Sequence, residues 1–241
     1  GEAMNIICLK WGDKYSHIEV NRLYKMCLKY FKDDFSFTCY TENSNQINKD
    51  IEILPLKLDY DLERWWWKLT LFENKVNDIT MFLDLDVVIQ NDITHYKKYY
   101  EKNKIYTIKA WWKPHARNAK PVAPGFNMDL NSSVIIWKEN FYDIWEHFND
   151  NPEYYMNKYQ GIDSYLYFHH FDKLRFFPRK EIYSRQHGFD EYNMWSHGKR
   201  VPLFFDETYN ICIFNKWKMD KQYGGHGLPE NAYEGFEKFW K

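Results

Sequence analysis

The sequence contains no run of about twenty apolar residues, the length that a helix needs to cross a bilayer. It also begins without the basic and apolar regions of a secretory signal peptide. These two absences predict a soluble, cytoplasmic protein. The residues Gly1 to Ala3, which precede Met4, are interpreted as a remnant of cloning.

Net charge is almost absent as well. The chain has 33 Lys and Arg against 34 Asp and Glu, which gives a formal net charge of -1. Such a balance creates no long-range field that would attract nucleic acid or an anionic membrane. Partners of these two classes are therefore not expected, and any recognition by charge must be local.

The four cysteines lack the C-x-x-C spacing of redox and zinc motifs. Cys8, Cys27, Cys39 and Cys212 are scattered among apolar residues. This distribution predicts buried, reduced thiols rather than disulfides or a zinc site.

Aromatic side chains are abundant. Of 241 residues, 44% are hydrophobic and 20% are aromatic, so the chain can bury a large core. The length predicts one α/β domain, which we place at residues 4–241. Eleven Trp and twenty Tyr permit two interpretations. Some of these rings line a groove for sugars or nucleobases, or all of them fill the core and the surface.

Strand-like and helix-like segments alternate along the chain. An amphipathic helix is expected from His17 to Phe31, with Ser16 as N-cap and Glu19 three residues later. Further helical spacing covers residues 65–76, 141–148 and 160–168, and short apolar runs predict strands at residues 5–9, 35–40, 51–56, 81–89, 105–110, 131–137, 174–178 and 210–214. This order predicts a parallel sheet with crossover helices.

The strand predicted at residues 81–89 contains Asp84 and Asp86 between apolar neighbours. In an extended chain, side chains two residues apart point to the same face, so the two carboxylates are expected to converge. Two ionised carboxylates in an apolar setting require either a cation or a solvated strand end. Mg²⁺ and Mn²⁺ take such oxygen ligands, commonly together with substrate phosphates.

A divalent ion at this position would bridge the two phosphates of a nucleotide sugar and neutralise the charge that grows on the leaving diphosphate. A D-x-D motif alone carries little information, because surface loops contain it by chance. Its place inside an apolar run makes a metal site a stronger hypothesis.

Four features in chain order resemble the GT-A fold glycosyltransferases, especially the metal-dependent group that includes glycogenin and the bacterial galactosyltransferases. The first is the loop after the N-terminal strand, and the second is the W-W-x-K-L-x-L-F-like segment at Trp66 to Phe72. The D-x-D at Asp84 to Asp86 and the N-S-S-V at Asn131 to Val134 follow. The resemblance implies one Rossmann-like α/β domain, with a central, mostly parallel sheet flanked by helices.

The same resemblance implies a hexosyltransferase-like enzyme that uses Mn²⁺ or Mg²⁺ and a nucleoside-diphosphate sugar. UDP is the first expectation for the nucleotide and GDP the second, and the acceptor is a glycan, a protein or a small molecule. Asp84 and Asp86 would hold the metal. The nucleotide and the donor sugar would contact the residues Leu9, Trp11, Gly12, Tyr15, Lys68, Asp84, Leu85, Asp86, Asn131, Ser132 and Ser133.

The chain departs from the group's pattern near the reacting sugar. Retaining members have a G-D-Q-like motif, whereas this chain has Gly161-Ile162-Asp163. Asp163 is either the general base of an inverting reaction or the nucleophile of a retaining one. It is alternatively an ordinary carboxylate at the start of a helix. The stereochemical outcome is therefore open.

The group's third metal ligand, a His in an F-H-G-x-x-K-P-like segment, is also missing. Residues 214–218 occupy that place, so the third ligand is either Asn215 or His226. Lys218 either neutralises a phosphate or is solvated. In the loop after Trp112, three side chains would gate the site or meet the acceptor: Lys113, His115 and Arg117.

Two other functions compete with glycosyl transfer. The D-x-D also resembles the opening motif of haloacid dehalogenase-like phosphatases, with Asp84 as the nucleophile. That motif normally lies on the first strand, and no convincing paired-aspartate motif follows here. A non-catalytic carbohydrate-binding domain would explain the tryptophans but would leave the two carboxylates unexplained.

Overall fold

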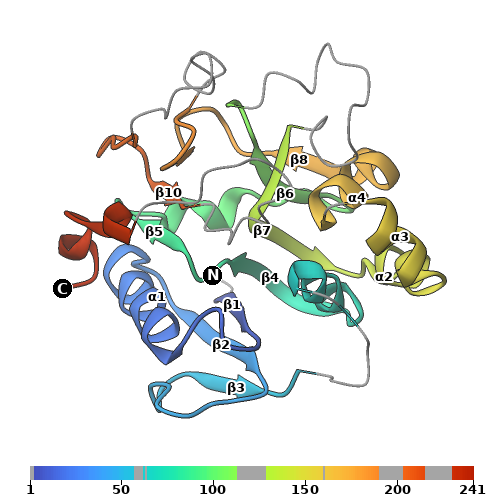
Figure 1. Ribbon diagram of the computed structural model, residues 1–241, viewed down its shortest axis with the longest axis horizontal. Coiled ribbons are helices and arrows are strands. Elements are labelled where there is room, and N and C mark those ends of the chain that lie inside the picture. The colour runs from blue at the N-terminus through green and yellow to red at the C-terminus, as the bar shows by residue number, and fades with distance from the viewer. Residues whose placement is uncertain are drawn as a thin grey trace.

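A seven-stranded mixed sheet forms the centre of the computed structural model (Figure 1). The structure describes residues 3–56, 62, 64–112, 129–159, 161–189, 203–214 and 230–241. The sheet has the order β3-β2-β1-β4-β7-β6-β8. Its strands are β1 (Met4–Lys10), β2 (Phe35–Thr41), β3 (Glu52–Leu54), β4 (Val76–Leu83), β6 (Ile105–Lys109), β7 (Leu130–Glu139) and β8 (Leu174–Phe176).

Most neighbouring strands run parallel. β1 pairs in parallel with β2 and β4, β2 with β3, and β6 with β8. β7 is antiparallel to β4 and β6. The chain proceeds outward from β1 to β3 and then returns to the other side of β1 as β4. The order in which the strands are added to the sheet therefore reverses between β1 and β4. Open α/β sheets commonly bind ligands at such a point.

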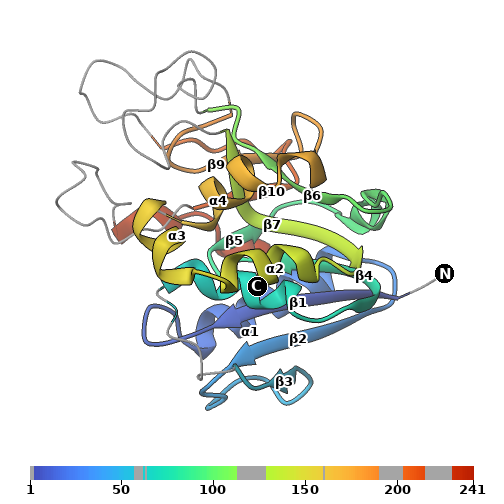
Figure 2. The ribbon, with the colours of Figure 1, turned by 90° about the vertical axis from the view of Figure 1, so that its right-hand side faces the viewer.

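Helices cover both faces of this sheet (Figures 1 and 2). On one face lies α1 (His17–Tyr30), whose start has the predicted capping box: the Ser16 hydroxyl accepts from the Ile18 amide, and the Glu19 carboxylate accepts from the Ser16 amide. The other face carries α2 (Tyr142–Asn149), α3 (Pro152–Lys158), α4 (Ile162–His169) and the 3₁₀ helix Arg64–Phe72. Buried apolar residues form one cluster on each face.

A small second sheet packs on the α1 side. It contains β5 (Val87–Ile89), β10 (Ile211–Ile213) and β9 (Ile182–Ser184), in the order β5-β10-β9. β10 is antiparallel to β5 and parallel to β9. Two further 3₁₀ helices, Glu230–Tyr233 and Glu237–Phe239, lie in what we call the C-terminal segment, residues 230–241.

The predicted strand 81–89 does not exist as one strand. β4 ends at Leu83, and residues 84–86 form a turn in which the Val87 amide donates to the Asp84 carbonyl at 3.3 Å. The chain turns because it passes from the large sheet into the small one. The expectation that Asp84 and Asp86 share one face of an extended strand is therefore wrong.

Most other predicted elements are present, with differences in detail. The tryptophan-rich helix is a 3₁₀ helix that ends at Phe72. The elements that were not predicted are α3, β9 and four 3₁₀ helices: Thr94–Lys98, Phe171–Lys173, Glu230–Tyr233 and Glu237–Phe239. All four cysteines are buried and free, as predicted. Within the described ranges, none of the helices combines the length and the apolar character that crossing a membrane requires.

Candidate functional site

Three predicted site segments meet at one edge of the large sheet. The loop 11–15 follows the carboxyl end of β1, and the turn 84–86 follows the carboxyl end of β4. Because β7 is antiparallel to β4 and Val134 pairs with Leu83, residues 131–133 lie beyond the end of β4. The sheet topology thus brings together segments that are far apart in the sequence, at the point where the strand order reverses.

The loop after β1 makes a tight turn at Gly12. Its φ of 58° lies in the left-handed region that glycine adopts readily. The Gly12 amide donates to the Glu42 carboxylate at 2.7 Å, which ties the loop to the end of β2. This turn leads to Tyr15 and to Ser16, where α1 begins.

Asp84 lies in ionic and polar surroundings. The Lys68 ammonium lies 2.8 Å from Asp84 Oδ1 and also donates to the Ser132 carbonyl and hydroxyl, each at 3.2 Å. The Asp84 amide donates to the Ser133 carbonyl at 2.9 Å. Lys68 therefore joins the turn to the start of β7. Whether it also contacts a nucleotide remains a prediction.

Burial raises the pKa of Asp84 to about 6, against the opposing effect of the Lys68 ammonium. The charge of Asp86 raises this pKa further. Ionising both carboxylates thus brings two negative charges together in a poorly solvated place. A divalent cation would relieve this repulsion, so the two carboxylates fit such an ion by charge and by ligand type.

Asp163 lies in the first turn of α4, beside the same segment. One of its carboxylate oxygens accepts a hydrogen bond from the Ser132 amide at 3.1 Å. A continuous path of contacts therefore runs from Asp84 through Lys68 and Ser132 to Asp163. This contact agrees with a role at the site and also with a structural role at the start of the helix.

Asp86, in contrast, lies among aromatic side chains. It is 6% exposed, and Tyr15 makes a side-chain hydrogen bond to it. Burial and then the charges of Asp86 and Asp84 raise the pKa of Tyr15 well above its usual range, so its hydroxyl stays protonated and donates. The Asp86 charge also acts on Tyr233 in the C-terminal segment, where burial is the main cause of a raised pKa.

The side chains of several other predicted residues are buried in the protein, whereas a side chain that contacts a substrate has to be accessible to it. Leu9 and Leu85 belong to the two apolar clusters. Asn131, Ser132 and Ser133 are also buried, and the Asn131 carboxamide oxygen accepts from the Ser133 amide at 2.8 Å. Trp11 is partly exposed beside the Gly12 turn. Each of these donor-site assignments remains a prediction.

Several predicted residues lie outside the described ranges. The two candidates for the third metal ligand are Asn215 and His226, and the candidate for phosphate binding is Lys218. The three residues of the loop after Trp112 are Lys113, His115 and Arg117. Within the ranges that are described, no group of three or more His, Cys, Asp or Glu side chains is arranged to hold a metal. The third ligand is therefore still open.

Sequence reasoning missed Tyr233 entirely. The residue lies far from Asp86 in the sequence, in a segment whose pattern predicts neither a strand nor a helix. The only local signal was the aromatic composition of the last residues. Its ring stacks on Phe214, which directly follows β10, and the sequence does not reveal this contact.

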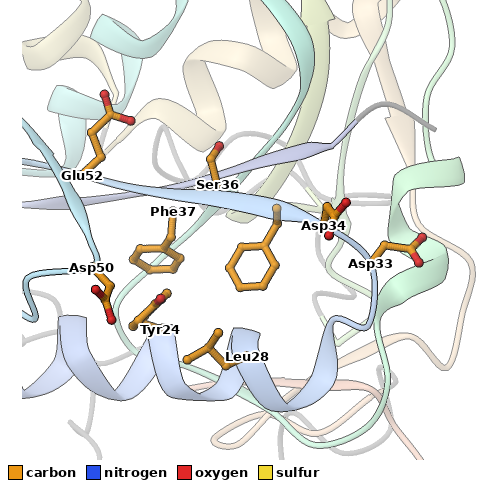
Figure 3. A pocket seen from close by; sticks show the side chains of 9 residues that line it. Tyr24, Leu28, Asp33, Asp34, Ser36, Phe37, Asp50 and Glu52 are labelled. Atoms are coloured by element: carbon orange, nitrogen blue, oxygen red, sulfur yellow. The ribbon is translucent and has the colours of Figure 1, made fainter.

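A separate cavity of about 340 Å³ lies between α1 and β2 (Figure 3). Tyr24, Leu28, Phe35 and Phe37 line it, together with the carboxylates of Asp33, Asp34, Asp50 and Glu52. Because these carboxylates would repel a diphosphate, the cavity does not fit the nucleotide. The sheet edge that carries Asp84 and Asp86 is the better candidate.

The chain has the GT-A fold of known glycosyltransferases. It superposes on the galactosyltransferase LgtC, solved in complex with donor and acceptor sugar analogues, with a TM-score of 0.61 and 13% identity over 98% of this chain and 93% of LgtC. For the glycosyltransferase GlyE of Streptococcus pneumoniae TIGR4, the TM-score is 0.59 and the identity 11%, over 100% of this chain and 61% of GlyE. No protein-family model and no curated protein matches the sequence.

Proposed function

We propose that this protein is a glycosyltransferase that moves a sugar from a nucleoside-diphosphate sugar to an acceptor and that depends on a divalent metal. One observation carries the proposal: two carboxylates meet at the carboxyl edge of a GT-A sheet, where the strand order reverses. The structural neighbours are glycosyltransferases, and LgtC was solved with sugar analogues bound. At this level of identity they support the fold, and the activity is our inference.

Asp84 and Asp86 are the residues that would hold Mn²⁺ or Mg²⁺. When bound, the ion would supply Lewis-acid stabilisation of the leaving diphosphate. Lys68 favours the ionised form of Asp84 and fixes its orientation, because its ammonium contacts the Asp84 carboxylate and Ser132 together. Tyr15 donates to Asp86, on the side where the loop after β1 would receive the nucleotide.

Asp163 is the candidate base or nucleophile. Its carboxylate lies against the Ser132 amide, so it is connected to the metal side of the site by only two further contacts. This connection would hold Asp163 in a fixed relation to Asp84. UDP is our first choice for the nucleotide and GDP the second.

The phosphatase alternative requires the D-x-D after the first strand of the fold. Here the motif follows β4, and β1 to β3 precede it in the chain and the sheet. In addition, the proposed nucleophile, Asp84, is paired with Lys68. A non-catalytic carbohydrate-binding domain would have no need for two carboxylates at this edge.

A thermal-shift panel tests the proposal most broadly. UDP-, GDP- and dTDP-sugars are compared with and without Mn²⁺, on the wild-type protein and on a variant with Asp84→Asn and Asp86→Asn. We expect stabilisation by one nucleotide class that requires both the metal and the aspartates. If no nucleotide stabilises the wild type in a metal-dependent way, the transferase proposal is wrong. Hydrolysis of p-nitrophenyl phosphate that Asp84→Asn abolishes would instead favour the phosphatase.

A further inference from the structure

We propose that Lys109, Trp111 and Arg179 form a subsite for an acceptor sugar that carries a negative charge. The inference names the chemical class of the acceptor, and it therefore rests on the function proposed above. Because the chain has a net charge of only -1, recognition of an anion has to come from a local group of cations. These three residues place such a group beside an aromatic ring.

Trp111 is the centre of this cluster. Its half-buried side chain follows the end of β6 by two residues. The Lys109 ammonium lies 4.4 Å from the centre of the Trp111 ring, and the Arg179 guanidinium carbon lies 5.3 Å from it. Both distances are within the range of cation–π interactions, which are strongest with tryptophan. Two cations from different segments, the end of β6 and the turn after β8, therefore meet at one ring.

The cluster offers hydrogen-bond donors to a ligand. Arg179 is exposed, and the Lys109 side chain is 28% exposed. The Lys109 ammonium lies 3.9 Å from Asp129 Oδ2, a distance that fits an ion pair but is too long for a hydrogen bond. An ammonium has three donors, and a planar guanidinium matches a carboxylate or a phosphate. The cluster therefore fits such an anionic group, and the indole adds apolar surface for the ring of a sugar.

The pairing of β6 with β7 places this cluster close to the candidate base. Lys109 pairs with Leu130, and Ser132, two residues later, donates its amide to Asp163 at 3.1 Å. Strand spacing puts the backbones of Lys109 and Ser132 about 8 Å apart. Lys109 also lies on the α4 face of the sheet, because Ile105, four residues earlier on β6, belongs to the apolar cluster of that face.

The cluster and the metal motif lie on opposite sides of β7 (Figure 1). The strand order is β4-β7-β6, with Asp84 directly after β4 and Trp111 just beyond β6. A donor held at the aspartates and an acceptor held at Trp111 would therefore meet over the start of β7, where Ser132 contacts Asp163. Sugar transfer requires this arrangement, because both substrates have to be held next to each other.

The first test measures sugar binding without a donor, by saturation-transfer difference NMR. The probes are two matched pairs, methyl glucuronide with methyl glucoside and glucose 6-phosphate with glucose. We expect the wild type to bind the anionic member of each pair about tenfold more tightly, the effect of a hydrogen bond between charged groups. Inorganic phosphate is the control probe. If it binds as tightly as glucose 6-phosphate, the cluster holds an adventitious anion only and the inference is wrong.

Variants assign this preference to the cluster. Lys109→Gln together with Arg179→Gln should abolish it, and each change alone should weaken it, which keeps the test valid if the double variant is unstable. The matched control is Lys138→Gln near the other end of β7, because the Lys138 ammonium also lies over an aromatic ring, 5.8 Å from the centre of Tyr100. It should keep the wild-type preference. A preference that survives the changes at Lys109 and Arg179, or no preference in the wild type, would overturn the inference.

The second test uses transfer itself, with the nucleotide sugar that the thermal-shift panel selects. The double variant should show a KM for the anionic acceptor that is raised about tenfold and an unchanged KM for the donor. An unchanged acceptor KM would contradict the subsite. If no nucleotide stabilises the protein with metal, the proposed function fails. The NMR test contains neither donor nor metal and then still decides whether the cluster binds an anionic sugar, so the two failures are distinguishable.

Discussion

Asp84 and Asp86 are separated by one residue and lie in unlike surroundings. Asp84 directly follows β4, at the edge of the large sheet, and contacts the Lys68 ammonium. The same ammonium donates to the Ser132 carbonyl near the start of β7. Asp86 begins the path into the small sheet and has Tyr15 and Tyr233 as neighbours. The Asp84 carboxylate is thus balanced by a full charge, whereas the Asp86 carboxylate accepts from the neutral Tyr15 hydroxyl. The turn at residues 84–86 is therefore a junction between two sheets, with each carboxylate supported from its own side.

This difference indicates a division of roles. The Lys68 ion pair ties Asp84 rigidly to Ser132 and, through it, to Asp163 on α4. Asp86 depends on the loop after β1, through Tyr15. Changes on the Asp84 side should therefore affect folding and geometry together, whereas changes on the Asp86 side should affect mainly ligand binding.

The largest effect is expected from Lys68→Met. Lys68 is 8% exposed, and its removal leaves the Asp84 carboxylate, whose side chain is 24% exposed, without its cation. Breaking one partner of a fully buried pair costs about 4 kcal/mol, and the partial exposure of Asp84 brings the expected cost to about 3 kcal/mol. We expect a loss of this size in urea unfolding, and a smaller one when Asp84→Asn accompanies Lys68→Met. Lys25→Met, at an exposed position of α1, is the control. A loss equal to the control's would contradict the rigid ion pair.

Acidic pH should destabilise the face of the sheet that carries α4. His170 follows α4 and contacts the Tyr165 hydroxyl at 3.0 Å, and burial together with Lys173 and His147 lowers its pKa to about 4. The unfolded chain binds this proton more readily, since the ordinary pKa of histidine is about 6.5. The contribution of His170 to stability should therefore be complete above pH 6.5 and be lost, by about 3 kcal/mol, as the pH drops towards 4, while protonation of Asp84, whose pKa is raised to about 6, offsets part of this loss.

Urea unfolding at several pH values measures this loss. His170→Gln should remove the loss that is due to this histidine, so between pH 6.5 and 4 the variant should lose about 3 kcal/mol less stability than the wild type. His17→Gln, at the start of α1 on the opposite face, should retain it. An unaltered profile in His170→Gln would contradict the assignment.

A smaller effect is expected from Gly161→Ala. A Cβ at this position would lie 2.2 Å from the Trp65 indole nitrogen, so the indole or the start of α4 must move. Such overpacking costs about 2 kcal/mol. We expect a lower melting temperature together with slower sugar transfer, since Asp163 follows two residues later. Gly235→Ala in the C-terminal segment, where φ is 85° and nothing lies within 4 Å of the added Cβ, should lower stability by backbone strain and leave transfer unchanged.

The sequence predicted those parts of the fold that local patterns determine. The capping box at Ser16 and Glu19 and the strands around residues 5–9, 35–40 and 131–137 are present because a cap and a short apolar run act over a few residues. The grouping of the segments 11–15, 84–86 and 131–133 also follows from these elements once the strand order is known.

The turn at Asp84 was missed for a physical reason. Residues 81–83 and 87–89 are both fully buried, so hydrophobicity gives no sign that the chain changes sheets between them. The contact between Phe214 and Tyr233 was missed because it depends on strand pairing between segments far apart in the sequence. Similarly, the pairing of Lys68 with Asp84 requires the packing of a 3₁₀ helix on the sheet.

The most direct test of the account is a Mn²⁺ titration followed by electron paramagnetic resonance, with UDP present, on the wild type, Asp84→Asn and Asp86→Asn. We predict one bound Mn²⁺ per wild-type chain and a loss of affinity of more than about 100-fold in each variant, because a direct ligand contributes more than its supporting partners do. Equal binding in the wild type and both variants would contradict a shared metal site at these two aspartates.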